Sequence, residues 1–183
     1  GYEAGPTVDK SGSKQGCGTF KDHFYPNIYA GYDELQNGIG DYREALGTLF
    51  YHDHTLDFTA PNVYRGLIGF YLLFDELDSG DERDPSPTAL RLPSHPYDYP
   101  LAFGDRRFSP MPDGQLFYDQ FHAEGVLGDK VVINGKIEPV LRVAARKYRL
   151  RLLNSGPSRF YDFYLVNARN AVQRFTYIAN DGN

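Results

Sequence analysis

Short runs of the chain alternate between apolar and polar residues with the period of two that is typical of β-strands. In TLFYHDH, residues 48–54, the even-numbered positions share one face of the predicted strand and the odd-numbered positions share the other. KYRLRLLN, residues 147–154, alternates in the same way and sets apolar residues opposite Lys147, Arg149 and Arg151. GLIGFYLLF, residues 66–74, is a continuous apolar run, which favours a strand buried on both faces over a helix.

Further strands are predicted between turn signals, and no amphipathic helix of convincing length is found. Asn134-Gly135 is a strong hairpin signal between two short strands within residues 131–141, and Pro139 places the second strand at an edge or an end. The other predicted strands are 100–108, 159–166 and 175–180. Loops, turns or extended connections are predicted at 1–19, 23–33, 37–41 and 59–64, the last because Pro61 interrupts regular pairing. Many short strands separated by Gly, Pro and Asn predict an all-β sandwich.

Residues 75–100 differ in composition, because a charge run is followed by five prolines. This pattern predicts a linker at 79–92 between a first domain, 1–78, and a second, 93–183. The acidic run lacks the ligand spacing of a calcium-binding loop, so a solvated connector is the favoured interpretation.

The overall composition excludes some classes of protein. The chain is 41% hydrophobic, which is enough for a core, and its net charge of −5 argues against nucleic acid as a partner. No apolar run reaches the roughly 18 residues that a membrane-spanning helix needs. Cys17 is the only cysteine, so no internal disulfide can form.

Several charged residues are weaker candidates for a functional site. Asp53, Asp57 and Asp75 could act as acid–base groups, but solvated or hydrogen-bonded roles are favoured. Three arginines could form an anion-binding site, but arginines on a strand more often form salt bridges on a face of the sheet. These arginines are Arg149, Arg151 and Arg159.

His52 and His54 are the strongest candidates for chemistry. Their spacing on a strand points both imidazoles the same way, and paired neutral imidazoles can bind Zn, Cu, Fe or Ni. The alternative is a pair of hydrogen-bonded core or surface histidines. Their place at the end of an apolar strand predicts partial burial, which favours neutral rings. Two ligands cannot complete a coordination shell, and the remaining histidines, His23, His95 and His122, stand singly.

Two segments resemble the multicopper oxidases, the superfamily of laccases, bilirubin oxidases and spore-coat oxidases. GTLFYHDHTLDFTAPNVYRGLIGFYLLFDE, residues 47–76, is similar to the segment that closes the first cupredoxin domain of that family, with Phe50 where Trp is usual. Residues 92–108 and 128–165 are similar to the opening of the second cupredoxin domain. The resemblance covers about residues 23–183 and implies cupredoxin-like Greek-key β-sandwich domains, both incomplete here.

The resemblance also implies a function. His52 and His54 would each ligate one of the two type 3 coppers, in an oxidase that couples one-electron oxidation of a phenolic, tetrapyrrole or metal-ion substrate to reduction of O₂ to water at a trinuclear cluster. The remaining oxidase domains would supply the type 1 and type 2 sites, because the family's other three histidine motifs are missing and Cys17 has no neighbouring histidine. The sequence therefore resembles an internal segment of a secreted, periplasmic or spore-coat oxidase. A non-catalytic cupredoxin-like binding or structural module is the alternative.

Overall fold

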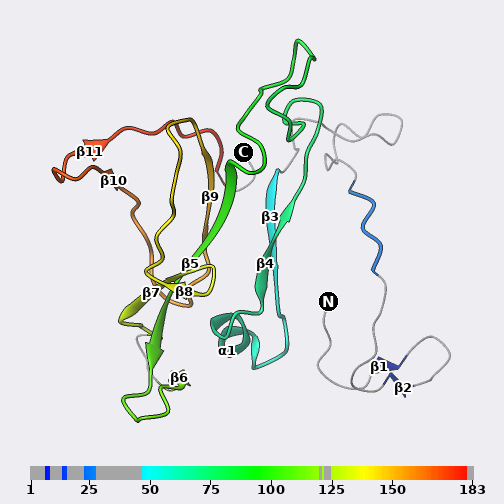
Figure 1. Cartoon of the computed structure of the whole chain (residues 1–183). Coiled ribbons are helices and arrows are strands. Elements are labelled where there is room, and N and C mark those ends of the chain that lie inside the picture. Colours follow the sequence, from blue (N-terminus) through cyan, green and yellow to red (C-terminus); the bar gives the residue numbers. More distant parts are fainter. Residues whose placement is uncertain are drawn as a thin grey trace.

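The computed structural model describes residues 7–8, 14–15, 23–27, 47–119, 121 and 125–180. Within these residues the regular elements are strands and one six-residue helix, so the predicted all-β class is confirmed (Figure 1). The elements are β1 (Thr7–Val8), β2 (Lys14–Gln15), β3 (Thr48–His52), α1 (Thr59–Tyr64), β4 (Ile68–Leu72), β5 (Asp98–Phe108), β6 (Leu116–Phe117), β7 (Lys130–Ile133), β8 (Lys136–Ile137), β9 (Arg149–Asn154), β10 (Leu165–Val166) and β11 (Val172–Gln173). The predicted turn at 37–41, Cys17 and His122 lie outside the described residues.

β3 and β4 form an antiparallel two-stranded hairpin in which His52 is opposite Ile68 and Thr48 is opposite Leu72. β3 ends at His52, two residues earlier than predicted. The prediction that β4 is buried on both faces is wrong, since every one of its residues is half-exposed. Among the described residues only β3 pairs with β4, so nothing in the sheet covers its second edge.

The segment TAPNVY was predicted as a loop and is instead helix α1, Thr59–Tyr64. Pro61 is compatible with it because the N–H groups of the first helical turn have no partner within the helix. Gly66 follows the helix with a φ of +109°, a conformation that glycine adopts without strain. This residue turns the chain back into β4.

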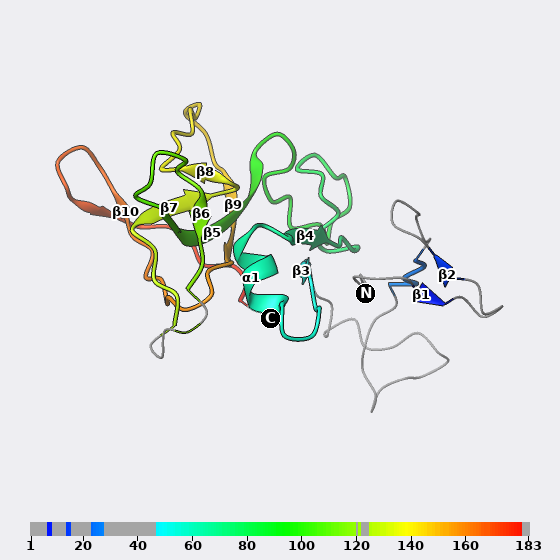
Figure 2. The ribbon, with the colours of Figure 1, turned by 90° about the horizontal axis from the view of Figure 1, so that it is seen from below.

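The second sheet has the strand order β6-β5-β7-β8, with β9 paired parallel to β5 (Figures 1 and 2). β5 confirms the strand predicted at 100–108 and begins two residues earlier, at Asp98. The predicted hairpin is also confirmed, because β7 and β8 pair antiparallel around Asn134 and Gly135. Both turn residues have positive φ, +48° and +80°, as a two-residue hairpin turn of this type requires.

β9 confirms the alternation predicted for residues 147–154, but its arginine face points inward. Arg151 is buried, whereas Leu150 and Leu152 are 51% and 41% exposed. Arg149 pairs with Asp78, and Arg151 pairs with Asp98. The salt-bridged sheet face is therefore confirmed over the anion site for these two arginines.

The strand predicted at 159–166 forms only over its last two residues, as β10, and the strand predicted at 175–180 is wrong. Only the two-residue strands β10 and β11 form in this region, as a hairpin around a turn in which the Asn167 side chain accepts hydrogen bonds from the N–H groups of Arg169 and Ala171. Aromatic residues made both runs strand-like in sequence, but Phe160 is 99% exposed and has no sheet face to pack on in the described part of the chain.

The segment 79–92 contains no helix or strand. Its carboxylates accept hydrogen bonds from nearby backbone N–H groups, as Asp81 does from Arg83 and Asp84 does from Ser86. The Ser79 side chain, followed by the Ser86 amide, lowers the pKa of Asp84. These contacts fit an irregular connector, and the domain boundaries stay a prediction. No helix in the described ranges is long and apolar enough to cross a membrane.

Candidate metal centre

The two candidate ligands lie where the first hairpin ends. His52 is the last residue of β3, and His54 follows after Asp53, whose N–H still donates to the carbonyl of Leu67 at 3.0 Å. The imidazole rings of His52 and His54 are stacked, with centroids 5.7 Å apart and planes 24° from parallel. Phe50 stacks on the other side of His52 at 6.0 Å. The rings thus lie on one side of the strand, as the spacing predicts.

Both histidines are exposed, so the predicted partial burial is wrong for this chain. The prediction relied on the apolar residues before them, but Phe50 on the same face is itself 50% exposed. A hydrogen bond instead fixes the tautomer of His52. Its Nδ1 lies 2.6 Å from the carbonyl oxygen of Asp53, and because a carbonyl only accepts, Nδ1 carries the proton. In the neutral ring, Nε2 then keeps its lone pair for a cation.

Asp53 has the opposite environment, since it is only 7% exposed between two exposed neighbours. Its carboxylate accepts hydrogen bonds from the Thr55 N–H at 3.1 Å, the Thr55 hydroxyl at 2.9 Å and the Asn62 side chain at 3.0 Å. The Asn62 amide is the main reason why the pKa of Asp53 lies below its ordinary value. The hydrogen-bonded role considered for Asp53 is therefore confirmed.

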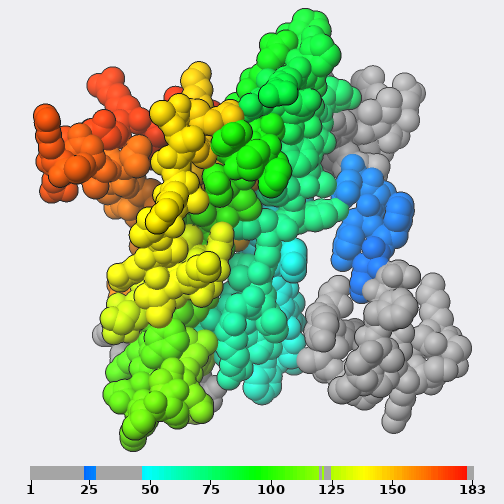
Figure 3. Space-filling view, in the orientation of Figure 1, coloured from blue at the N-terminus to red at the C-terminus, as the bar shows by residue number. Residues whose placement is uncertain are grey.

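Arg151 anchors the beginning of β3 to the second sheet. Its guanidinium binds Asp98 through Nε and Nη2, at 2.9 and 2.7 Å, and donates from Nη1 to the Thr48 hydroxyl at 2.5 Å. The side chain is 2% exposed and that of Asp98 is 9% exposed. Figure 3 shows the surface of the β3–β4 hairpin, in cyan and teal, in contact with the green and yellow surface of the second sheet. The ion pair with Asp98 thus holds the Arg151 side chain within the second sheet, and the hydrogen bond to Thr48 ties the hairpin to it.

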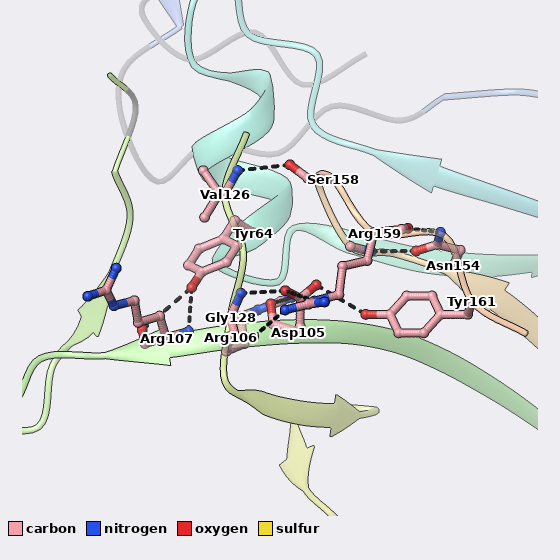
Figure 4. A network of polar contacts seen from close by, with 11 residues as sticks. Tyr64, Asp105, Arg106, Arg107, Val126, Gly128, Asn154, Ser158, Arg159 and Tyr161 are labelled. Carbon is pink, nitrogen blue, oxygen red and sulfur yellow. Dashed lines mark hydrogen bonds and ion pairs between the residues drawn. The ribbon is translucent and has the colours of Figure 1, made fainter. Parts of the chain in front are cut away.

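Tyr64 anchors the other end of the hairpin through α1. It is fully buried, and its hydroxyl accepts a hydrogen bond from the Arg107 N–H at 2.7 Å (Figure 4). The guanidinium of Arg106 lies 4.7 Å from the centre of its ring, and Tyr118 packs edge-on at 5.2 Å. Burial raises the pKa of the Tyr64 hydroxyl, which stays neutral as a hydrogen-bonding group.

Behind Tyr64, the carboxylate of Asp105 organises a buried network (Figure 4). It accepts hydrogen bonds from the N–H of Gly128, from Arg159 Nε at 2.9 Å and from the Tyr161 hydroxyl at 3.1 Å. Arg159 also donates to the Gly128 carbonyl at 3.0 Å. The carboxylate therefore joins β5 to the chain before β7 and after β9.

Tyr161 gives this network a pH dependence. Desolvation, followed by the charge of Asp105, raises the pKa of Tyr161 to about 12, whereas an unfolded tyrosine titrates near 10. The neutral hydroxyl therefore contributes stability below pH ~10 that is lost progressively as the pH rises toward the folded value. We expect Tyr161→Phe to cost about 1 kcal/mol at neutral pH and to remove this loss. Urea unfolding of both proteins should show that the difference between their free energies of unfolding becomes smaller as the pH rises above about 10. A difference that does not change with pH would contradict the raised pKa of Tyr161.

Among the described residues, no three His, Cys, Asp or Glu side chains are gathered closely enough to hold a metal ion. Imidazole nitrogens suit copper, so His52 and His54 fit part of a copper site and would need further ligands.

Comparison with known proteins identifies the family. The chain is 37% identical to a laccase from Bacillus stratosphericus over 149 residues, which are 74% of this chain and 26% of the laccase. It is 32% identical to a bilirubin oxidase from Albifimbria verrucaria over 168 residues, 90% of this chain and 25% of that protein. The crystal structure of a variant of the McoA multicopper oxidase from Aquifex aeolicus matches with a TM-score of 0.52 at 33% identity, over 64% of this chain and 24% of that one.

The chain belongs to the multicopper oxidase superfamily. No protein-family model matches the sequence. The chain spans about a quarter of the length of the relatives described above. The cupredoxin-like fold class expected for a multicopper oxidase is confirmed by the solved structures.

Sequence reasoning about this multicopper oxidase segment missed the residues that hold the histidines in place. Asn62 and Tyr64 lie in a segment predicted to be a loop, so the pattern indicated no direction for their side chains. In helix α1 the Asn62 side chain reaches Asp53 and the Tyr64 side chain reaches Arg107. The signal was present as an Asp-x-Thr motif, which typically caps its own backbone, followed by a proline compatible with a first helical turn.

Proposed function

We propose that this chain supplies two copper ligands, His52 and His54, to a multicopper oxidase, one for each metal of a type 3 pair. The observation that carries the proposal is the stacked pair of imidazoles on one side of the chain, with the proton of His52 on Nδ1 and its Nε2 available. Similarity to laccases and bilirubin oxidase supports copper over the other metals that imidazoles bind.

For the whole protein, we propose oxidation of a small phenolic, tetrapyrrole or metal-ion substrate coupled to four-electron reduction of O₂ to water. Bound copper would supply the one-electron chemistry that joins these two half-reactions. The other ligands of the trinuclear cluster and the type 1 site would come from domains outside residues 1–183. The boundaries proposed within the chain are a first cupredoxin-like domain to residue 78, a connector over 79–92 and a second domain from residue 93.

Within this scheme the chain's own residues orient and hold the ligands. The carbonyl of Asp53 fixes the tautomer and direction of His52, which is the usual task of an acceptor behind a metal-bound imidazole. Arg151 and Tyr64 fix the two ends of the hairpin that carries both rings. The exposure of the rings suits a site that other domains complete.

The test uses the complete polypeptide that contains this chain, loaded with copper. Removing a direct ligand should lower copper affinity by more than the roughly 10–100-fold that is typical when a residue behind a ligand is changed. We therefore expect His52→Ala and His54→Ala to lose copper, measured per polypeptide by atomic absorption, and to lose O₂ consumption with a phenolic substrate. His95→Ala is the matched control, because His95 is also exposed, and it should behave as the parent. Full copper content and activity in His52→Ala would instead favour the non-catalytic module.

A further inference from the structure

The residue between the two histidines is held more firmly than the histidines themselves. Asp53 is buried while His52 and His54 are exposed, and its carboxylate accepts three hydrogen bonds. Two of these come from Thr55, which is local, and one comes from Asn62 on α1. The Asn62 bond therefore connects the carboxylate between the two histidines to the helix.

The backbone around Asp53 is fixed at the same time. Its N–H donates to Leu67 at the start of the return strand, and its carbonyl accepts the proton of His52 Nδ1. The carbonyl of Thr55 accepts from the N–H of Phe58 and from the Thr59 hydroxyl at 2.8 Å, which leads directly into α1. A rotation of the Asp53 peptide would thus break the bond that sets the His52 tautomer.

We propose that Asp53 and Asn62 are a positioning pair through which α1 sets the direction of the two histidine side chains and so the copper affinity of the site. The inference rests on the proposed function, since it concerns the same ligands. Neither residue would touch the metal. The carboxylate holds the peptide that His52 binds, and the Asn62 amide holds the carboxylate.

A purely structural role would give a different result. If the pair only stabilised the turn, its loss would lower the melting temperature of the copper-free protein and leave the affinity for copper unchanged. If it positions the ligands, affinity should fall by about 10–100-fold, as for other residues behind metal ligands.

The experiment exchanges the hydrogen-bond donor and acceptor of the pair in the complete polypeptide. Asn62→Asp places two carboxylates together and removes the donor. In the double variant Asp53→Asn with Asn62→Asp, an NH₂ group in the place of Oδ2 can donate to the new carboxylate at 62, and the remaining oxygen still accepts from the Thr55 hydroxyl. The Thr55 N–H, which also donates to Oδ2, loses its acceptor, so the pair is restored only in part. The surface change Asn180→Asp adds the same charge and is the matched control, since Asn180 is exposed. Copper(II) is titrated against a competing chelator, and the melting temperature is measured without copper.

We expect weaker copper binding in Asn62→Asp, partial recovery in the double variant and parental binding in the control. Parental affinity in Asn62→Asp would overturn the inference, as would a double variant that regains thermal stability but not affinity. His52→Ala is measured alongside: if it also binds copper normally, the proposed function fails, whereas weak binding by His52→Ala with normal binding by Asn62→Asp overturns the positioning pair alone.

Discussion

Replacing Arg151 with alanine is expected to lower the free energy of unfolding by about 3–5 kcal/mol, the usual cost of breaking a buried ion pair. The guanidinium is 2% exposed and is bound by both oxygens of Asp98, which is itself 9% exposed. Alanine would leave that carboxylate in a dry site with only Arg149, at 3.9 Å, for compensation. Urea unfolding of the protein measures the loss.

The matched control is Arg169→Ala, which removes an exposed arginine and should change stability by no more than about 0.5 kcal/mol. A double-mutant cycle with Thr48→Val isolates the bond between the second sheet and β3, and we expect a coupling of about 0.5–3 kcal/mol. An Arg151→Ala protein as stable as the control would show that the Arg151 side chain stabilises neither the second sheet nor its contact with β3.

Arg151 matters for function because the same guanidinium that pairs with Asp98 also donates to Thr48, at one end of the histidine-bearing hairpin. Arg151 donates to Thr48, the first residue of β3. Tyr64, the last residue of α1, accepts a hydrogen bond from the backbone of Arg107 in the second sheet. His52 and His54 lie between these anchors, on a hairpin that has two strands in the described part of the chain, the second of them half-exposed. The position of the ligands therefore depends on polar contacts with the second sheet more than on apolar burial.

The features predicted correctly from the sequence are those that neighbouring residues determine. Asn134 and Gly135 both accept positive φ, so the hairpin between β7 and β8 follows from two adjacent residues. The common direction of His52 and His54 follows from the period of two along an extended chain. The family resemblance similarly depends on contiguous segments.

The features that the sequence leaves open or predicts wrongly depend on distant partners. Alternation in β9 defines two faces but does not say which is buried, and that choice follows from Asp78 and Asp98, which lie more than 50 residues earlier in the chain and accept the arginines. The same limit applies to the histidines. Their apolar neighbours suggested burial, yet no described element covers that face.

Asp105→Ala is expected to destabilise the protein by about 3 kcal/mol or more, because it leaves buried donors without an acceptor. The N–H of Gly128 and the hydroxyl of Tyr161 both donate to this carboxylate, and its side chain is 2% exposed. Arg159 is 43% exposed and can turn to water, so its share of the loss is smaller.

The isosteric variant Asp105→Asn separates acceptor capacity from size. Asparagine fills the same space but presents an NH₂ group to one of the donors, so most of the destabilisation should remain. Asp162→Ala, which removes an exposed carboxylate from the same region, should be nearly neutral. If Asp105→Asn unfolds at the same urea concentration as the parent, the carboxylate is not what joins β5 to the segments around it. Both Asp105 variants should lose more free energy of unfolding than Tyr161→Phe does. This order is expected because one buried carboxylate accepts from several donors at once.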